Sequence, residues 1–392
     1  MSPGPIRSVA VLLGVLAGSP ALAQVPDAAA VRGASLRGVE FLRKAQDASG
    51  AWTVTIQGKK EPQTGLTGLV LLAILEGPGR PAADDPQVRK AVEFLKKQVR
   101  EDGSISAGTL LNYETSAALQ GLAAAGDQEL KPLIEKARDF LLKHQADEGE
   151  KYTPKDRHYG GAGYGNQGNA LRVPDMSNLS LWAEGLRAAG VPKGHESFKK
   201  ALYFLERCQN HSETNQERVE DAQKRIVVSG NDGGGVYAVG DSKAGFDPGP
   251  EGTVVARSYG SMTYALFKGY VYGGLGRDDP RVKAALQWLS GHWTLDENPG
   301  FDTARDPEAG QQGLFYYYWT MAQALDAAGV DEITTPAGET HSWRPALAGK
   351  LLSLQRPDGS WKNEKDRWYE ANAELATAYA LQALARCRKG LK

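Results

Sequence analysis

One phrase of sequence recurs along this chain and constrains its fold more than any other feature. The phrase is a basic residue, an aromatic-leucine pair, a glutamine, a glycine and a tryptophan at fixed spacing, and it is clearest over residues 37–52. Partial copies, and a second strong copy of its end, follow at Lys136, Lys200, Lys283 and residues 355–361. Such repetition predicts one supersecondary unit that is used several times.

Each copy belongs to an amphipathic helix, which is followed by a loop and then by a nearly all-apolar helix. Residues 64–75 are apolar on almost every side, and a helix of that kind must be buried all round. We expect six such pairs. The amphipathic helices cover 35–46, the segment from 85, 132–145, 196–209, the segment from 279, and 343–355. The apolar helices that follow them cover, in the same order, 64–75, 113–125, 175–190, the segment from near 258, 314–328 and 370–386.

Six amphipathic and six apolar helices predict an all-α fold, an α6–α6 toroid in which the apolar helices form an inner ring. The stack must close, because an open array would expose the apolar faces of its end repeats. An open α-solenoid such as a tetratricopeptide array is the alternative, but solenoids keep a tighter period than the glutamine intervals of this chain. We expect a single toroid domain over residues 35–392, after a lead-in segment over 24–34.

The first 23 residues differ from the rest in composition. Arg7 gives a short positive start, residues 9–17 are apolar, and Ala21-Leu22-Ala23 has the small-residue pattern of a cleavage site. We therefore expect residues 1–23 to be a secretory signal peptide, and the mature protein to be exported to the periplasm or the extracellular space. An uncleaved membrane anchor is the alternative, and it leaves membrane proximity open.

Charge and cysteine content exclude some classes of partner. A net charge of −1 gives no sign of a nucleic-acid surface. Cys208 and Cys387 could pair after export, but two buried thiols are the preferred interpretation. The 6 histidines show no metal-ligand spacing. We expect no metal and no cofactor.

The phrase at residues 37–52 resembles the repeat of squalene–hopene and oxidosqualene cyclases, position for position, and the resemblance extends over nearly the whole expected mature chain. This glutamine–tryptophan (QW) motif is structural. The resemblance implies that Gln46 ties its helix end to the next repeat and that Trp52 stacks against this glutamine. Protein prenyltransferase β-subunits are similar in having a single toroid of this kind.

The chain departs from these families in its chemistry. The Asp-x-Asp-Asp acid of squalene–hopene cyclases and the Asp-Asp-x-x-Asp run of other terpene synthases have no counterpart in the sequence. Neither cysteine has an aspartate two residues before it, as the prenyltransferase zinc site requires. The resemblance implies an isoprenoid or triterpenoid ligand in the central cavity. It leaves open whether that ligand is cyclised, isomerised, transferred or only bound.

The starts of the inner helices should line one rim of the toroid, where the long loops of pairs three to five also gather. The candidate catalytic residues are three carboxylates of this rim: Asp296, Glu297 and Asp175. The candidate cavity-binding residues are Asp232, Arg257, Tyr259, Tyr264, Tyr316, Trp319 and Trp182. Structural roles remain possible, because Asp175 is a natural helix N-cap and residues 296–300 have turn chemistry. Glu114 and Glu370 belong to the same predicted rim.

An aromatic cavity suits a small set of functions. Its rings can stabilise a migrating cation by about 0.5–2 kcal/mol each. Such a cavity can equally hold an isoprenoid or a sugar. We expect an exported protein that binds or transforms an isoprenoid or triterpenoid ligand. The alternatives are a glycan-active (α/α)6 enzyme that uses rim carboxylates and a non-catalytic protein-interaction scaffold.

Overall fold

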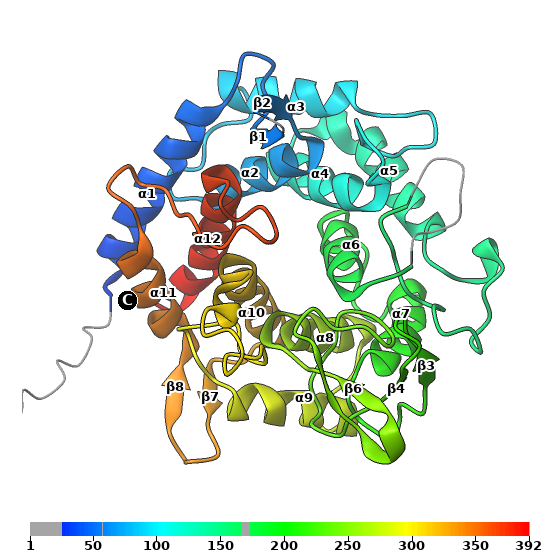
Figure 1. Ribbon diagram of the computed structural model, residues 1–392. Helices are drawn as coiled ribbons and strands as arrows, with labels where there is room; N and C mark the ends of the chain where they lie inside the picture. Colours follow the sequence, from blue (N-terminus) through cyan, green and yellow to red (C-terminus); the bar gives the residue numbers. More distant parts are fainter. Residues whose placement is uncertain (1–25, 57, 166–172, 392) are drawn as a thin grey trace, which may run out of the picture.

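A computed structural model describes residues 26–56, 58–165 and 173–391; the expected signal peptide lies outside the described residues. Figure 1 shows the inner helices arranged as a ring. They are α2 (Thr64–Glu76), α4 (Leu111–Ala125), α6 (Met176–Ala188), α8 (Gly260–Gly273), α10 (Leu314–Ala328) and α12 (Ala373–Cys387). Each inner helix packs against the next and α12 packs against α2, so the ring closes.

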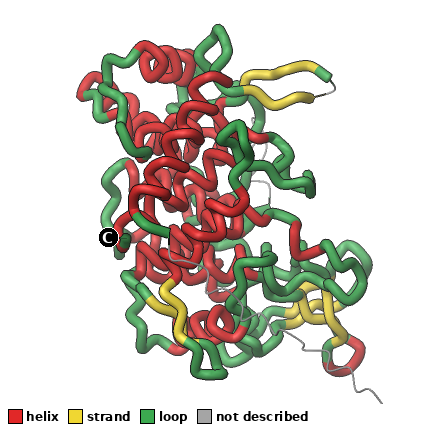
Figure 2. The backbone as a smooth tube through the Cα atoms, turned by 90° about the vertical axis from the view of Figure 1, so that its left-hand side faces the viewer, coloured by secondary structure: helices red, strands yellow, loops and turns green. Residues whose placement is uncertain are grey.

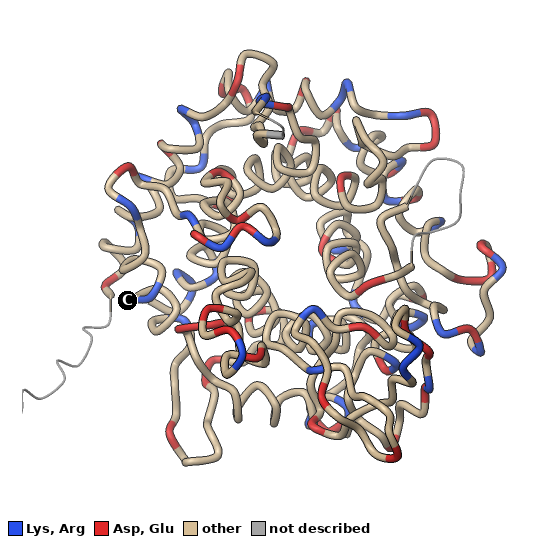
Figure 3. Tube along the Cα trace, viewed as in Figure 1, with Lys and Arg blue, Asp and Glu red and all other residues tan. Residues whose placement is uncertain are grey.

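Six outer helices surround this ring (Figure 1). They are α1 (Ala28–Ala45), α3 (Pro86–Lys97), α5 (Lys131–Lys143), α7 (Glu196–Arg207), α9 (Pro280–Gly291) and α11 (Trp343–Leu354). The predicted all-α toroid is therefore confirmed, and the open solenoid is not what the chain forms. Figure 3 shows charged residues mainly on the outer layer and the loops, as expected for a ring of buried apolar helices.

Two helix starts differ from the sequence-based expectation. Helix α1 begins at Ala28, with the Asp27 carboxylate accepting from the backbone N–H of Ala30, so most of the expected lead-in is helical. Alanine favours the helix, and burial of Val31 and Ala34 anchors this added turn. Helix α12 begins at Ala373, which leaves Glu370 in the preceding loop.

Short strands occupy three of the connections. β1 (Thr53–Ile56) and β2 (Lys59–Pro62) form one antiparallel hairpin, and β7 (Glu332–Thr334) and β8 (Thr340–Ser342) form another. The long connection after α7 contains a four-stranded sheet in the order β3-β4-β6-β5, whose strands are β3 (Arg218–Glu220), β4 (Ile226–Val228), β5 (Phe246–Pro248) and β6 (Val254–Ala256). Short 3₁₀ turns complete the structure at Gln128–Leu130, Glu148–Glu150, Pro250–Gly252, Ala309–Gln311 and Arg388–Gly390.

The strands mark the two faces of the toroid. Figure 2 shows the β1–β2 hairpin and the four-stranded sheet projecting from one side of the helical body, whereas the β7–β8 hairpin lies on the other side. The first two follow outer helices and precede inner ones, so they lie at the amino-terminal ends of the inner helices. The longest loops therefore gather on the face that the sequence predicted.

A glutamine after each of four outer helices joins neighbouring pairs. The Gln46 side-chain amide donates to the carbonyl oxygens of Gly50 and Gln87, both at 3.0 Å, and Gln87 belongs to the next outer helix. The same double contact is made by Gln145 with Gly160 and Ser197, by Gln209 with Gly233 and Arg281, and by Gln355 with Gly359 and Ala34. The last of these links α11 to α1, which closes the outer layer.

The glycine of the repeat is required where its turn meets the next outer helix. Gly50 has a φ of 92°, and an added Cβ would overlap the carbonyl oxygen of Lys90 in α3. A side chain would be strained at this φ and would also collide with backbone. Gly359 stands in the same relation to Arg37 of α1. The fixed spacing of glutamine and glycine in the repeat therefore reflects this close contact between the turn and the next outer helix.

The tryptophan of the repeat is anchored through its indole N–H. Trp52 donates to the Leu42 carbonyl oxygen at 2.7 Å, and Trp361 donates to that of Leu351 at the same distance. In the third pair the donor comes from the inner helix, because Trp182 of α6 donates to the Leu141 carbonyl oxygen at 2.9 Å. The expected cavity residue Trp182 therefore faces the outer layer, where it also contacts Phe198 edge to face at 5.6 Å.

A buried polar side chain occurs at the ninth or tenth residue of five inner helices. We call this set the polar belt: Gln120, Glu184, Lys268, Gln323 and Gln382. Lys268 pairs with Glu184 at 2.9 Å and donates to Gln323 at 2.7 Å. Gln382 accepts from the Trp319 indole at 2.8 Å and donates to the Leu69 carbonyl oxygen at 3.0 Å. The belt thus links α6, α8, α10, α12 and α2.

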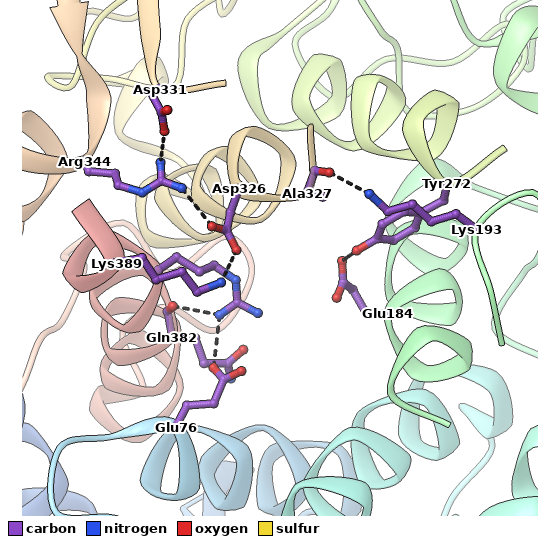
Figure 4. Close-up of polar contacts among 11 residues, drawn as sticks. Glu76, Glu184, Lys193, Tyr272, Asp326, Ala327, Asp331, Arg344, Gln382 and Lys389 are labelled. Atoms are coloured by element: carbon purple, nitrogen blue, oxygen red, sulfur yellow. Dashed lines mark hydrogen bonds and ion pairs between the residues drawn. The ribbon is translucent and has the colours of Figure 1, made fainter. Parts of the chain in front are cut away.

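Further ion pairs lie at the carboxyl ends of the inner helices. Figure 4 shows Asp326 between Arg344 and Lys389, and the Tyr272 hydroxyl directed at Glu184. Cys208 and Cys387 are buried free thiols, as preferred from the sequence. Among the described residues, no helix has both the length and the apolarity that crossing a bilayer requires.

Candidate functional site

A cavity of about 400 Å³ lies at the amino-terminal ends of the inner helices. We call it the chamber. All six inner helices contribute to its wall through their first turns or the residues just before them. The third residue of five of these helices lines it: Leu66, Tyr113, Met262, Tyr316 and Leu375. The prediction that inner-helix starts line one rim is confirmed.

Aromatic rings dominate the wall of the chamber: Tyr113, Tyr164, Tyr237, Tyr259, Tyr316, Trp368, Tyr369 and Tyr379. Several of these rings contact one another. Tyr316 and Tyr379 meet edge to face at 5.9 Å, and Tyr113 lies 6.5 Å from Tyr164. Burial raises the pKa of the Tyr113 hydroxyl to about 12, so this phenol stays neutral at ordinary pH. The ionisable side chains of Glu114, Lys243 and Glu370 interrupt a wall made mainly of aromatic and aliphatic groups.

The carboxyl group of Glu370 lines the chamber beside these rings. Its residue is only 1% exposed, and burial raises its pKa to about 7. The carboxyl oxygens accept from the Tyr316 backbone N–H at 2.7 Å and from the Asn363 side-chain amide at 2.7 Å. These donors hold the group in one place and also connect it to the start of α10. Glu370 therefore holds a proton near neutral pH within a mostly apolar wall.

Asp175 lies directly behind the wall on the α6 side. As predicted, it is the N-cap of α6, with Oδ1 accepting from the Asn178 backbone N–H at 2.9 Å. Oδ1 also accepts from the Ser177 hydroxyl at 2.6 Å, and Ser177 lines the chamber. Burial raises the pKa of the Asp175 carboxyl. Asp175 thus reaches the chamber through Ser177.

The other two predicted catalytic carboxylates do not reach the chamber. The Asp296 side chain is 87% exposed and pairs with Lys350 of the outer helix α11 at 2.7 Å. Glu297 packs against Gly310 and is not part of the lining. The buried residue of this run is Asn298, whose Oδ1 accepts from the Ser261 backbone N–H at 3.0 Å. Residues 296–298 therefore form the turn that supports the start of α8.

Of the predicted cavity-binding residues, Tyr259 and Tyr316 line the chamber. Trp319 lies one layer deeper, stacked on Tyr379 at 4.8 Å, because its indole bonds to the polar belt. Tyr264 is buried against Tyr317 at 5.8 Å. The sequence predicts that all four aromatic residues lie near the ring centre. The face of the helix on which each one lies decides whether it lines the chamber or packs in the core.

The two charged residues predicted for the cavity are engaged elsewhere. Asp232 accepts from the Ser258 hydroxyl at 2.8 Å and from the Gly234 backbone N–H at 2.9 Å. Asp232 therefore shapes the turn that packs against α9. The adjacent glycines 233–235 belong to the same turn. Arg257 pairs with Asp247 at 2.6 Å and with Asp302 at 3.4 Å. Neither residue belongs to the chamber lining.

Several lining residues were missed as site residues: Tyr113, Tyr164, Tyr237 and Tyr379. One signal could have found Tyr113, because it holds the same third position of its inner helix as Tyr316. Tyr164 and Tyr237 come from loops, where no helical register applies. Over the described part of the chain, no three His, Cys, Asp or Glu side chains gather in an arrangement that could hold a metal ion.

This chain is similar to known proteins in sequence and in fold. The family model of the squalene-hopene cyclase C-terminal domain matches residues 59–224. A variant of the type II terpene cyclase MstE from Scytonema, in complex with geranylgeranyl dihydroxybenzoate, is similar with a TM-score of 0.54 at 17% identity, over 93% of this chain and 99% of that chain. The apo MstE structure has a TM-score of 0.53 at 17% identity, with the same coverage of 93% and 99%.

A D-mannose isomerase crystal structure is also similar, with a TM-score of 0.54 at 12% identity over 95% of this chain and 100% of that chain. At these identities the solved structures show a shared fold, and function must be argued from the site. No curated protein matches the sequence.

Proposed function

Since this chain is squalene–hopene cyclase-like in its repeat and terpene cyclase-like in its fold, we propose that its chamber binds and transforms an isoprenoid or triterpenoid ligand. The aromatic wall of the chamber is the observation that carries this proposal. A volume of about 400 Å³ suits a small ligand, and a mostly apolar wall with few polar groups suits a prenyl chain.

The second element of the proposal is a proton donor. Glu370 faces the chamber with a pKa of about 7, so a large fraction of it is protonated at neutral pH. Its proton can add to an alkene carbon of the ligand. The π pair then forms the new C–H bond and leaves a cation on the neighbouring carbon. Rings such as Tyr316 and Tyr379 supply the negative π faces that stabilise such a cation.

This acid would replace the Asp-x-Asp-Asp motif that the sequence lacks. The Glu370 carboxylate formed by proton loss keeps its hydrogen bonds from Tyr316 and Asn363. Hydrogen bonds to the charged form favour proton release, whereas burial opposes it. Glu370 is thus partly protonated at neutral pH and is also provided with donors for its charged form.

The isoprenoid proposal is better supported than the glycan alternative. That alternative relied on carboxylates such as Asp175 and Asp296 meeting at the rim. Asp296 instead pairs with Lys350 on the outer layer, and Asp175 reaches the chamber only through Ser177. A protein scaffold, in turn, has no need of a buried carboxyl in an aromatic cavity.

Ligand binding tests the proposal. We expect farnesol or geranylgeraniol to bind the purified protein and to raise its melting temperature, because a ligand that binds only the folded state stabilises it. Tyr316→Ala should weaken binding about 3- to 10-fold, which corresponds to roughly 0.7–1.4 kcal/mol for one ring contact. Binding is measured by isothermal titration calorimetry.

Tyr203→Ala is the matched control, because Tyr203 is an exposed tyrosine on the outer helix α7. This change should leave the affinity as it is. Failure of both alcohols to bind, together with binding of oligosaccharides, would refute the isoprenoid proposal in favour of the glycan alternative.

A further inference from the structure

We propose that the α6 wall of the chamber is a proton acceptor, with Ser177 as the group that touches the ligand and Asp175 as the residue that positions it and receives its proton. This inference rests on the proposed function and adds its second half. Glu370 delivers a proton, and the Ser177–Asp175 pair removes one. The resulting reaction class is the isomerisation of an alkene.

The two acidic groups belong to different parts of the chamber wall. The inner helices follow one another around the ring in chain order, so α6 and α12 are three helices apart in either direction. Figure 1 shows them facing each other across the ring. Ser177 is in the first turn of α6, and Glu370 lies between the start of α10 and the start of α12. A ligand in the chamber therefore meets the two groups at different points of the wall.

The Asp175 side chain is surrounded by donors, and one of them opens on the chamber. The Ser177 hydroxyl donates to Oδ1 at 2.6 Å, and the Asn178 amide donates to Oδ2 at 2.7 Å. The Tyr237 hydroxyl, also from the chamber wall, interacts with the same carboxylate. Asp175 itself is 3% exposed. A proton can therefore reach this carboxylate from the ligand through Ser177.

Capping alone does not account for this arrangement. The N-cap residues of α2, α4, α8 and α10 make no side-chain cap contact, and side chains from other segments, Asn298 and Glu370, take that place at α8 and α10. Beyond the cap contact, Asp175 fixes a hydroxyl that faces the ligand. The buried Oδ1 of Asn178 has no hydrogen-bond partner, so polar capacity remains unused beside the chamber.

The proposed step balances in atoms and electrons. The Glu370 proton adds to one alkene carbon, and the π pair becomes the new C–H bond. The adjacent cation then loses a proton from the next carbon, and that C–H pair becomes the new double bond. Ser177 Oγ takes this proton as its own hydroxyl proton passes to Asp175. Exchange with water restores Glu370 and Asp175, so substrate and product have the same composition.

Burial has the right effect on the acceptor. It raises the pKa of the Asp175 carboxyl, which makes the carboxylate a stronger proton acceptor than an exposed aspartate. The hydrogen bonds from Ser177 and Asn178 oppose this shift and hold the charged form ready. Burial thus favours uptake of a proton, whereas the hydrogen bonds keep the carboxylate charged before the proton arrives.

Deuterium exchange tests the inference with geranylgeraniol as the probe. In D₂O the wild-type protein should return the probe with carbon-bound deuterium, detected by mass spectrometry. Asp175→Asn should lower the rate at which the deuterated, isomerised alkene forms at least about 10-fold, because general acid–base groups typically contribute 10²–10⁴-fold. Asparagine is also a good N-cap, so the melting temperature and probe affinity should change little. Ser177→Ala should have the same effect on this rate.

A product readout separates chemistry from structural support. Without the acceptor, the cation persists until water captures it, so Asp175→Asn should increase the share of hydrated alcohol among the products. Asp27→Asn is the matched control, because it changes another N-cap aspartate in the outer helix α1. It should leave both the rate and the products unchanged.

The outcomes are distinct for the two proposals. No binding of the probe would refute the proposed function itself. Binding without deuterium incorporation by the wild type would refute proton donation by Glu370, and the acceptor inference with it, while leaving ligand binding intact. A normal rate of alkene formation and an unchanged product ratio in Asp175→Asn and Ser177→Ala would overturn the acceptor inference as well.

Discussion

At the scale of single residues, Glu370 and Asp175 show how one carboxyl group can combine structure with chemistry. Glu370 accepts from backbone N–H groups at the start of α10, and Asp175 accepts from one at the start of α6. Both are nearly inaccessible, and burial raises the pKa of each. Helix starts tolerate such groups because the unpaired N–H donors there favour a carboxylate.

Glu370 should make the stability of the protein depend on pH. Its pKa is about 7 in the folded state against 4.5 for the free group. Between these values the folded state binds more protons than the unfolded state, so the free energy of unfolding falls as pH rises from about 4.5 to 7. The shift corresponds to about 3 kcal/mol. Urea denaturation at several pH values should show this loss in the wild type and a smaller one in Glu370→Gln.

Glu40→Gln provides the control for this comparison. The Lys44 partner of this exposed glutamate lowers its pKa, so its removal cannot reproduce the effect. Identical pH slopes in the wild type and Glu370→Gln would show that Glu370 titrates normally in the folded protein.

At the scale of elements, the repeat works as a joint between consecutive helical pairs. The glutamine ties a turn to the next outer helix, and the glycine lets that turn approach backbone. In pair two the tie is replaced. Gln98 donates only within its own helix, to the Phe94 carbonyl oxygen at 3.3 Å, and Val99 forms a β-bridge with Ile105. The glycine contact is kept where the glutamine is lacking, because Gly103 seats this turn against the Lys136 backbone of α5.

Gln209 should be the most sensitive of these joints. Its fully buried amide donates to Gly233 and Arg281 at 2.9 and 2.8 Å, and its Oε1 accepts from the Tyr270 hydroxyl at 2.7 Å. Gln209→Leu removes all three hydrogen bonds and takes this partner from the buried Tyr270 hydroxyl and Gly233 carbonyl oxygen. Each unsatisfied group costs about 1–3 kcal/mol, so we expect a loss of at least about 2 kcal/mol in urea denaturation.

The matched control is Gln98→Leu, which removes one long bond inside a helix. It should cost less than about 1 kcal/mol, in line with a single exchangeable hydrogen bond. If both variants lost the same free energy of unfolding, the contact of Gln209 with the next helical pair would add no stability beyond that of a hydrogen bond at a helix end.

At the scale of the whole molecule, two kinds of contact hold the ring together. Polar-belt residues and their partners join α6 to α8, α8 to α10, α10 to α12 and α12 to α2. Between α2 and α4 there is close backbone packing instead, and a Cβ on Gly68 would overlap the Ala117 carbonyl oxygen. The belt lies below the chamber, since Trp319 connects Gln382 to the lining residue Tyr379.

The Lys268–Glu184 pair tests this view of the ring. Both residues are buried, with side chains 1% and 11% exposed. Removing one partner of a buried pair leaves an isolated charge, so Lys268→Met should cost about 3–5 kcal/mol. Lys268→Met combined with Glu184→Gln removes both charges and should cost clearly less. Thermal or urea unfolding of the two variants measures the difference, and a double variant no more stable than the single one would contradict the prediction.

Much of the fold could be predicted because its signals are local and repeated. Helix periodicity, the aspartate-proline starts and the glutamine-glycine spacing each act within a few residues. The candidate site could be predicted only in part. Tyr259 and Tyr316 were identified, whereas Asp296 was misplaced because two adjacent carboxylates in a turn look alike whether they face a cavity or solvent. In the folded chain Asp296 faces solvent and pairs with Lys350, a residue distant in sequence.

Local sequence patterns suffice to predict the toroid, the number of helical pairs and the face on which the long loops gather, because a repeated amphipathic unit has few ways to bury its apolar side. Which polar groups enter the chamber depends instead on how distant segments pack. Glu370 comes from a loop, is held by the start of α10 and lines the same cavity as Ser177 of α6. Such meetings depend on the packing of segments far apart in the chain, which no local pattern encodes.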